Sequence, residues 1–432
     1  MATTRSPRSV TFADRDKPIY AVWEITLRCN QACAHCGSRA GPTEERPDEL
    51  STAELLEVAA ELVRLGTREV TLIGGEAYLR DDIFDIVHYL SAQGIRVTMQ
   101  TGGRGLSPRL AKALKDAGMK AVGVSVDGPE EIHDVLRDSV GSWRSAMRAL
   151  EVCKEVGLVT SSNTQVNNLN AHMLREIGAM IKKTGVRVWR VQLTVPMGRA
   201  ADRPEWILDP PKILDVIDTL AAMQLEEVAM VRAKGLPPER AFNIMSSNNV
   251  GYYGPHEQVL RSRPGGDEAY WRGCQAGVYT IGIESDGTVK GCPSLPTAPY
   301  TGGKVRDLGL EEIWKNAEEL NFVRERTTEE LWGFCKTCYY ADICRAGCSF
   351  TTHCTLGRRG NNPFCYHRAA TLKREGRKER LVLKEAAAGI PYDFGRFEIV
   401  EEPWDAGDAA AQESSPSQSE STPSPSTSVA PG

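Results

Sequence analysis

The sequence predicts an α/β fold in which a parallel sheet is followed by a cysteine-rich part with little regular structure. Between residues 18 and 196, short β-rich runs alternate with helix-prone runs. This alternation is typical of strands that crossover helices join into a parallel sheet. From residue 273 to about residue 367 cysteines dominate, and bonds to metal can replace a packed core there.

Six strand-then-helix units follow one another along the first part. The first helix has the clearest start, because Ser51 is a good N-cap with Glu54 three residues later, and Gly66 follows its end. Strands are expected at 20–27, 68–73, 95–101, 121–126, 158–166 and 186–195, and helices at 51–65, 82–92, 110–117, 142–156, 174–183 and 210–233. Six units suit a partial barrel or an open sheet, and the pattern alone does not choose between them.

The rest of the chain divides by composition. The stretch 234–272 is rich in Gly, Pro and Asn, 371–385 is charged and helix-prone, and 405–432 is rich in Ala, Ser, Pro and Thr without any aromatic residue. Such a tail is expected to be disordered. The expected divisions are an N-terminal extension (1–17), the sheet part (18–203), a last helix with a bridge (204–272), a cysteine-rich domain (273–370), a C-terminal segment (371–404) and a tail (405–432).

Charge and hydropathy narrow the cellular context. The net charge of -5 gives no sign of a nucleic-acid partner. No apolar run approaches the roughly 20 residues of a membrane span, and the N-terminus lacks the apolar core of a secretory signal. A cytoplasmic protein is therefore expected, and its 12 cysteines point to metal ligation rather than disulfides. Cys153 stands alone in a helix-prone run and is interpreted as a small core residue.

Three cysteines follow the first strand directly. Cys29, Cys33 and Cys36 form a C-x3-C-x2-C pattern on one short loop. Three such thiolates can hold three irons of a cubane cluster and leave the fourth iron without a protein ligand. A structural zinc site would want four ligands, and His35 lies between its neighbours where it could hardly reach the same ion. The pattern therefore favours an iron–sulfur cluster.

The segment from Cys29 to Cys36 resembles the signature of the radical S-adenosylmethionine (SAM) superfamily, in which the open iron binds the amino and carboxylate groups of SAM. The resemblance implies that the six strand-then-helix units form the partial (β/α)6 barrel of that superfamily. Three further segments agree with this resemblance, each at the carboxyl side of a predicted strand, where ligands of parallel sheets gather. Glycines there allow close backbone approach, and a carboxylate can accept from an ammonium group. The residues that the resemblance places against SAM are Gly74, Gly75, Glu76, Ser125, Asp127, Asn163 and Gln192.

Seven later cysteines stand at characteristic spacings: Cys274, Cys292 in a Gly287-x4-Cys pattern, Cys335-x2-Cys338-x5-Cys344-x3-Cys348, and Cys365. They resemble the SPASM domain, a cysteine-rich extension of some radical SAM enzymes, so that the resemblance covers about residues 18–370. A zinc ribbon would want two CxxC pairs, and only one is present. The resemblance implies two auxiliary 4Fe-4S clusters beside the SAM-binding one. Cys354 is left over, either as a fourth ligand of the first auxiliary cluster or as a spectator beside an open iron. The implied ligands are Cys274, Cys292 and Cys348 for auxiliary cluster I, and Cys335, Cys338, Cys344 and Cys365 for auxiliary cluster II.

The resemblance also implies a reaction. Reductive cleavage of SAM would give a 5′-deoxyadenosyl radical that removes hydrogen from carbon. The runs 23–27 and 73–80 resemble SPASM maturases of ribosomally synthesised peptides, including a subgroup named for a Gly-Asp-Leu motif. Oxidation or cross-linking of a peptide is therefore expected; the alternative is a dehydrogenase or epimerase acting on a small molecule or a peptide residue. Pro293 stands where sulfatase-maturing members carry an aspartate base, which argues against formylglycine formation.

Partners follow from the same reasoning. A precursor peptide and a flavodoxin- or ferredoxin-type reductant are expected, with no nucleic acid and no membrane. Only about seventeen residues precede the first strand, too few for a folded leader-binding domain. A leader peptide would therefore be held by a separate protein or by the bridge 204–272. No residue is assigned as catalytic beyond the ligands of SAM and the clusters.

Overall fold

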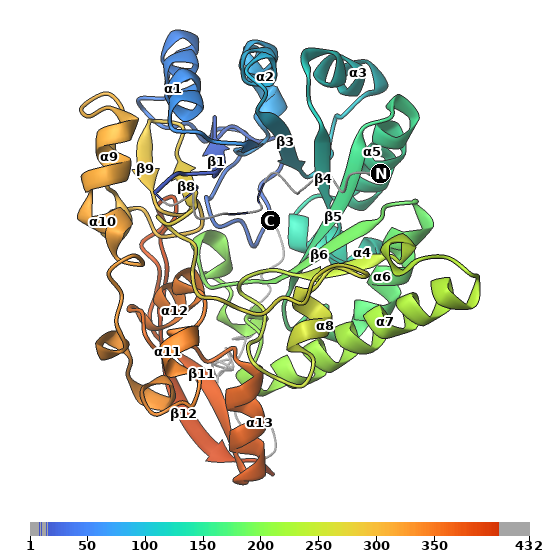
Figure 1. Cartoon of the computed structure of the whole chain (residues 1–432), viewed down its shortest axis with the longest axis vertical. Helices are drawn as coiled ribbons and strands as arrows, with labels where there is room; N and C mark the ends of the chain where they lie inside the picture. The colour runs from blue at the N-terminus through green and yellow to red at the C-terminus, as the bar shows by residue number, and fades with distance from the viewer. Residues whose placement is uncertain (1–7, 9, 11–13, 15, 406–432) are drawn as a thin grey trace, which may run out of the picture.

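A computed structural model describes residues 8, 10, 14 and 16–405 (Figure 1). Most of the tail for which disorder is expected, and most of the N-terminal extension, lie outside these residues. Among the residues that the structure describes, every helix is too short or too polar to span a lipid bilayer.

The six strands expected from the sequence are present and lie parallel, in chain order, within one ten-stranded sheet. Helices connect them, and Ser51 and Glu54 form the expected capping box. These strands are β1 (Tyr20–Glu24), β2 (Glu69–Ile73), β3 (Arg96–Thr101), β4 (Ala121–Ser125), β5 (Val159–Val166) and β6 (Val188–Leu193). The helices are α1 (Thr52–Arg64), α2 (Ile83–Ala92), α3 (Pro108–Ala117), α4 (Glu130–Arg137), α5 (Ser142–Val156), α6 (Leu174–Lys183) and α7 (Ile213–Ala233).

The sheet continues at both ends beyond the six expected units. Within the bridge 204–272, β7 (Asn243–Ser246) pairs in parallel with β6, and α8 (Glu257–Arg261) follows it in the chain. From the cysteine-rich part, β8 (Thr280–Ile283) pairs in parallel with β1, and β9 (Thr288–Lys290) and β10 (Gly303–Lys304) follow antiparallel. The expected boundary at residue 273 is therefore not a break in the sheet, because the second part extends the first.

The main core lies between the strands and their helices. Trp23, Leu72, Val124 and Val191 are almost fully buried in one apolar cluster that spans the sheet. Cys153, on α5, belongs to the same cluster and is fully buried, which confirms its interpretation as a core residue.

The cysteine-rich part contains short helices around its loops, which Figure 1 shows along the left-hand side and at the bottom. These are α9 (Leu310–Asn316), α10 (Glu318–Asn321), α11 (Ala341–Cys344), α12 (Ser349–Leu356) and α13 (Tyr366–Arg374).

The helical expectation for 371–385 is wrong beyond Arg374. The chain instead forms a hairpin of β11 (Arg377–Glu385) and β12 (Arg396–Pro403). Opposite charges face each other across it, with Arg380 Nε 2.8 Å from a Glu402 oxygen and Lys384 Nζ 2.9 Å from a Glu398 oxygen. Such cross-strand pairs stabilise a hairpin. The charged residues for which the sequence predicts a helix thus lie on strand β11, where they pair with residues of β12 further along the chain.

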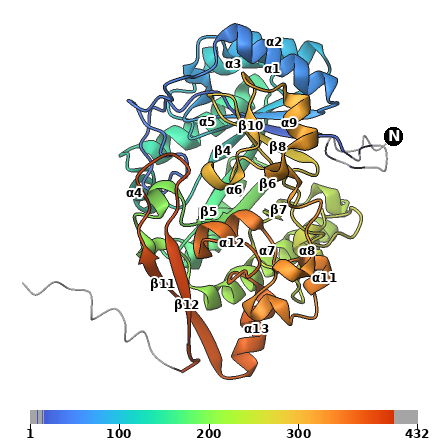
Figure 2. The same cartoon turned by 90° about the vertical axis from the view of Figure 1, so that its left-hand side faces the viewer.

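The tip of this hairpin reaches the carboxyl edge of the main sheet (Figure 2). The hydroxyl of Tyr392 donates to Glu24 at the end of β1, at 2.5 Å. Asp393 accepts from Arg39 on the cysteine loop at 2.8 Å, and Phe394 bridges to Met197 beyond β6. The C-terminal segment therefore forms part of the wall around the predicted site.

Charges are buried where the hairpin tip meets β8 and β9. Lys290 is fully buried, and its Nζ lies 2.6 Å from Glu284 Oε1 and 2.6 Å from the Leu295 carbonyl oxygen. Arg46 lies between the same Glu284, at 2.8 Å, and Glu24, at 3.0 Å. Two carboxylates are thus balanced by two cations away from solvent. Such a set is costly to break, because the remaining charge is left unpaired.

Replacing Lys290 by Met is expected to lower the free energy of unfolding by about 3–5 kcal/mol, because it leaves one excess buried carboxylate. Lys304→Met is the matched control. It breaks the pair with Asp286 at 2.9 Å, in which the lysine side chain is 40% exposed, and should cost less than about 1 kcal/mol. Denaturant unfolding of the anaerobic protein measures both, and equal losses would contradict the expectation.

Candidate functional site

The loop that carries the first three cysteines lies just beyond the carboxyl end of β1. Cys29 and Cys33 are buried and Cys36 is half-buried. Burial, together with the charge of the nearby Glu76 carboxylate, raises the pKa of Cys29 to about 12. Burial likewise raises the pKa of Cys33. Thiolates at these positions therefore need a compensating cation, and metal binding supplies one.

The described residues contain no set of three or more His, Cys, Asp or Glu side chains gathered closely enough to share one metal ion. Cluster ligands do not need that arrangement, because each thiolate binds a different iron. The donor set on the loop is purely sulfur, which suits iron–sulfur ligation.

Arginines that the sequence analysis did not single out hold the loop in place. Arg199, just after β6, donates to the carbonyl oxygens of Cys33 at 2.7 Å, Arg39 at 3.0 Å and Ala40 at 2.5 Å. Arg203 donates to the carbonyl of Ala34 at 3.1 Å. These carbonyl oxygens of the loop thus receive hydrogen bonds from the segment that follows β6. Nothing in the local sequence distinguishes these arginines from solvent-exposed ones.

The chain after β6 approaches the loop closely at Gly198. Its φ is +60°, and a Cβ atom there would lie 2.3 Å from the Cys36 carbonyl oxygen. Only glycine suits this position. The glycine just after the sixth predicted strand was the available signal for the contact.

Gly74, Gly75 and Glu76 follow β2 and lie against the segment that leads to the cysteines. The amide of Gly75 donates to the Thr26 carbonyl at 2.8 Å, and that of Glu76 to the Arg28 carbonyl at 2.9 Å. A Cβ atom on Gly75 would lie 2.3 Å from the Arg28 oxygen. The two glycines are therefore required for close packing against the segment that leads to the cysteines, and their expected contact with SAM stays a prediction.

The Glu76 carboxylate is buried at the ends of β2 and β3. It accepts from the Thr101 hydroxyl at 2.5 Å and the Gly102 amide at 2.9 Å. Burial raises its pKa, and these donors act against that rise. The carboxylate thus lies beside the cysteine loop with its orientation fixed.

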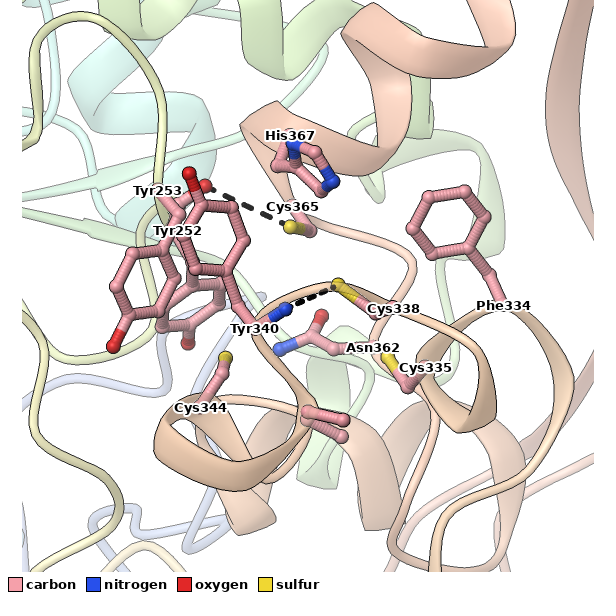
Figure 3. Close-up of a pocket in the computed structure, with 12 residues that line it drawn as sticks. Tyr252, Tyr253, Phe334, Cys335, Cys338, Tyr340, Cys344, Asn362, Cys365 and His367 are labelled. Carbon is pink, nitrogen blue, oxygen red and sulfur yellow. Dashed lines mark hydrogen bonds between the residues drawn. The ribbon is translucent and has the colours of Figure 1, made fainter.

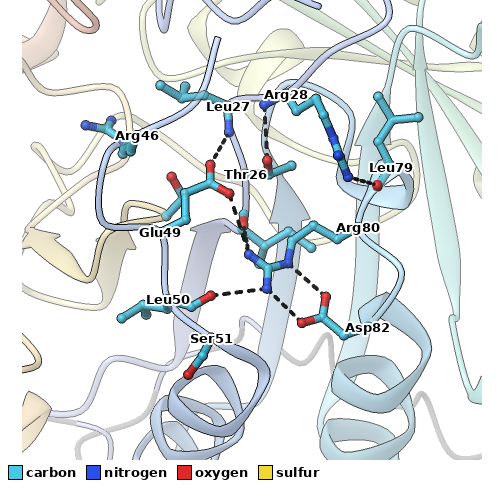
Figure 4. A network of polar contacts seen from close by, with 12 residues as sticks. Thr26, Leu27, Arg28, Arg46, Glu49, Leu50, Ser51, Leu79, Arg80 and Asp82 are labelled. Atoms are coloured by element: carbon cyan, nitrogen blue, oxygen red, sulfur yellow. Dashed lines mark hydrogen bonds and ion pairs between the residues drawn. The ribbon is translucent and has the colours of Figure 1, made fainter. Parts of the chain in front are cut away.

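A second polar network braces the chain between β1 and the cysteines (Figure 4). Arg80 donates to the carbonyls of Ile25 and Leu50, both at 3.1 Å, and pairs with Asp82 at 2.7 Å. The Leu27 amide donates to Glu49 at 2.9 Å. These contacts fix the direction in which the chain leaves the sheet toward Cys29.

The other predicted SAM contacts lie on neighbouring strands. Ser125 on β4 is opposite Asn163 on β5, and Gln192 on β6 is opposite Gln165. The Asn163 amide donates to Gln100, while its Oδ1 is buried without a partner, as is Gln31 Nε2. Buried polar atoms normally have partners. Unsatisfied ones at this edge of the sheet fit a polar ligand such as SAM.

Asp127, also expected to contact SAM, already has partners within the protein. Its side chain is fully buried, and its carboxylate accepts from the Gln165 amide at 2.9 Å and from Arg137 Nε at 2.8 Å. Burial opposes its ionisation, but the charges of Arg137 and His35 prevail and lower its pKa to about 2. The carboxylate therefore has no accessible surface for a ribose hydroxyl, and it anchors an arginine instead.

The four cysteines predicted for auxiliary cluster II line one cavity (Figure 3). Aromatic rings surround it, including Tyr253 stacked on Tyr340 with centroids 4.3 Å apart. Burial raises the pKa of Cys365 to about 12. The four cysteines, although separated by up to 30 positions in the chain, thus line the same cavity. The lining cysteines are Cys335, Cys338, Cys344 and Cys365.

The three cysteines predicted for auxiliary cluster I also meet. Cys274 and Cys292 pack in one apolar group with Tyr300. Burial, followed by the charge of Cys274, raises the pKa of Cys348 to about 12. Cys354 is fully buried but packs in a different group, against Val195 and Met197 after β6 and Tyr392 of the hairpin tip. Its assignment as a fourth ligand stays a prediction.

Tyr252 lies between the two auxiliary groups. Its ring lines the cavity of Cys335, and its hydroxyl accepts from the Cys348 amide at 3.0 Å and donates to the Asn248 carbonyl at 2.6 Å. Tyr252 is fully buried, so the two hydrogen bonds of its hydroxyl are shielded from solvent. Sequence reasoning did not identify it, because it lies in the bridge, far from either cysteine motif.

Comparison with known families and proteins agrees with this geometry. Residues 23–181 match the model of the radical SAM superfamily, and residues 274–339 match that of an iron-sulfur cluster-binding domain, SPASM. An AdoMet-dependent heme synthase from Methanosarcina barkeri is 30% identical over 355 residues, which are 81% of this chain and 97% of that protein. The mycofactocin maturase MftC from Mycobacterium ulcerans is 30% identical over 369 residues, 84% of this chain and 92% of the relative.

Two solved structures share the fold. The structure described as native anSMEcpe with bound AdoMet has a TM-score of 0.62 at 18% identity, covering 82% of this chain and 95% of the other. Streptococcus suis SuiB bound to its precursor peptide SuiA has a TM-score of 0.59 at 14% identity, covering 78% and 72%. The family domains imply SAM and iron–sulfur clusters as cofactors. The chain belongs to the radical SAM enzymes that carry a SPASM domain.

Proposed function

We propose that this enzyme modifies a ribosomally synthesised peptide by removing hydrogen from carbon, with oxidation or a cross-link as the result. It would use one SAM-binding cluster and two auxiliary clusters. The proposed ligands are Cys29, Cys33 and Cys36 for the SAM cluster, Cys274, Cys292 and Cys348 for auxiliary cluster I, and Cys335, Cys338, Cys344 and Cys365 for auxiliary cluster II.

The convergence of the cysteines carries the proposal. Ten cysteines from distant parts of the chain form three groups, and burial disfavours the free thiolate at members of each group, Cys29, Cys348 and Cys365 among them. Groups of this kind are stable as thiolates only when bound to metal. Two auxiliary clusters beside a radical site suit a net oxidation, because a cluster can accept the electron of the substrate radical.

The residues of the chain have distinct parts in this proposal. When bound, SAM would supply the 5′-deoxyadenosyl radical needed for hydrogen abstraction. Gly74 and Gly75 admit SAM close to the backbone, and Glu76 receives its amino group. Polar side chains of three neighbouring strands would orient the nucleoside, and Asp127 would act through Arg137. The residues proposed to face the nucleoside are Ser125, Asn163 and Gln192.

The apolar group at the hairpin tip would exclude water from the radical. Val195, Met197, Cys354 and Tyr392 are all buried there, beyond the end of β6. Exclusion of water from the reacting centre is one demand that such chemistry makes on its protein. The peptide would lose one hydrogen atom to the radical, then one proton and one electron, the latter to an auxiliary cluster.

Relatives support a peptide substrate. MftC is named a maturase, and SuiB was solved with a precursor peptide. A small molecule is the second candidate, because three relatives that cover most of this chain are named heme synthases. The reductant would be a flavodoxin or ferredoxin, and any leader peptide would be held by a separate protein or by the bridge 204–272.

Co-expression with any short peptide that a gene beside its own encodes tests the proposal. We expect mass spectrometry to find a peptide lighter by two hydrogen atoms per modification, only with active enzyme. The control is the enzyme with Cys29, Cys33 and Cys36 all replaced by Ala, which should leave the peptide unmodified. Unchanged peptides together with SAM cleavage stimulated by a porphyrin would favour the small-molecule candidate and contradict the peptide.

A further inference from the structure

Helix α4 is docked onto the cysteine loop through its last turn. The carbonyl oxygen of Leu136 accepts from the Ala34 amide at 3.0 Å and lies 2.7 Å from His35 Nδ1. The next residue, Arg137, donates from Nη1 to Cys33 Sγ at 3.8 Å. A guanidinium is thus presented directly to one of the three sulfurs of the loop.

Asp127 holds this guanidinium on the side opposite Cys33. Its Oδ2 accepts from Arg137 Nε at 2.8 Å and from Nη2 at 2.5 Å, a two-point contact that sets the plane of the group. The carboxylate is in turn held by the Gln165 amide on β5. The Asp127 side chain is fully buried and that of Arg137 is 10% exposed, so water screens the arrangement little. The positive end of the pair faces Cys33.

We propose that Arg137, positioned by Asp127, raises the reduction potential of the SAM-binding cluster through its contact with Cys33. The inference rests on the proposed cluster ligands. Reduction adds one negative charge to the cluster, and a fixed, poorly screened N–H donor with positive charge stabilises the reduced form more than the oxidised form. Hydrogen bonds to cluster sulfurs and local charge are among the factors that set such potentials.

This role explains why a buried ion pair lies at this place. A buried pair is weak evidence for stability, since desolvation offsets its attraction. An arginine that only held the loop could bond to carbonyl oxygens, as Arg199 and Arg203 do. Arg137 meets the sulfur instead. Arg137 is therefore a positioning and tuning residue of the cluster, and the reduction potential is the property that reports on it.

The test is an anaerobic redox titration of the holoenzyme, followed by electron paramagnetic resonance, with the SAM cluster recognised by its response to SAM. In Arg137→Met we expect the equilibrium constant for one-electron reduction to fall about tenfold or more, a shift of about 59 mV. Arg137→Lys, which keeps the charge, should recover part of the loss. The two auxiliary clusters, whose ligands do not contact Arg137, should keep their potentials.

Arg203→Met is the matched control, because Arg203 meets the same loop only at the Ala34 carbonyl and contacts none of its sulfurs; its other contacts are the Arg199 carbonyl and the Trp206 ring. It should change the constant less than about twofold. An unchanged potential in Arg137→Met, or an equal shift in Arg203→Met, would overturn the inference. If Arg137→Met holds no cluster, Arg137→Gln is titrated with the same expectation. A wild-type enzyme without a SAM-responsive cluster would contradict the proposed function itself.

Discussion

Replacing Cys29, Cys33 and Cys36 together by Ala is expected to abolish formation of 5′-deoxyadenosine from SAM. The three thiols are the only sulfur donors that we propose for the SAM cluster, so their loss leaves SAM without its iron. The auxiliary groups lie elsewhere in the fold and should keep their clusters. Iron content should fall from about twelve to about eight atoms per chain, as three 4Fe-4S clusters become two.

Cys153→Ala is the matched control for this variant. Cys153 is fully buried in the main core, remote in sequence from every other cysteine. Its replacement removes one sulfur and should change neither iron content nor deoxyadenosine formation. Liquid chromatography after anaerobic reduction measures the nucleoside. SAM cleavage that persists in the triple variant would contradict the assignment of these cysteines.

Gly75→Ala is expected to weaken SAM binding by at least about tenfold, or about 1.4 kcal/mol. The added Cβ atom would lie 2.3 Å from the Arg28 carbonyl oxygen and 2.6 Å from Cys29 Cβ, far inside contact distance. Because both neighbours belong to the segment that carries the cysteines, the collision must displace the loop or the strand end. Either movement separates Glu76 from the proposed position of the SAM amino group.

Gly309→Ala supplies the control for Gly75. A Cβ atom at Gly309 would meet only Glu61 side-chain atoms, the nearest at 3.8 Å, which is ordinary contact. It should leave SAM affinity within about twofold. Equilibrium dialysis with the anaerobic holoenzyme measures both variants, and the same affinity in Gly75→Ala as in wild type would show that this close approach has no bearing on SAM.

The fold was predictable wherever the signal is local. The strands from β1 to β6 are short β-rich runs followed by helical runs, and the capping box at Ser51 marks a helix start by itself. β8 and β11 were not predictable in the same way. Their partners, β1 and β12, lie elsewhere in the chain, and the charges of β11 acquire their pairing only in the folded hairpin.

The role of the cysteines as cluster ligands stays a prediction. Their spacing pattern could be recognised in the sequence because such ligation demands fixed residues at fixed spacing. The residues that hold the cysteine loop in place could not be recognised in the sequence. Arg199 and Arg137 become distinctive only when the fold brings them to the cysteine loop. Asp127 shows the limit most clearly, since its place at a strand end was correct while the direction of its carboxylate depended on Arg137, ten residues later.

Electron paramagnetic resonance of the reduced holoenzyme, recorded with and without SAM, tests the central claim most directly. The account predicts that SAM changes the signal of one cluster, that this signal is absent when Cys29, Cys33 and Cys36 are replaced, and that auxiliary signals remain. A wild-type spectrum that SAM leaves unaltered in the fully reconstituted enzyme would contradict it.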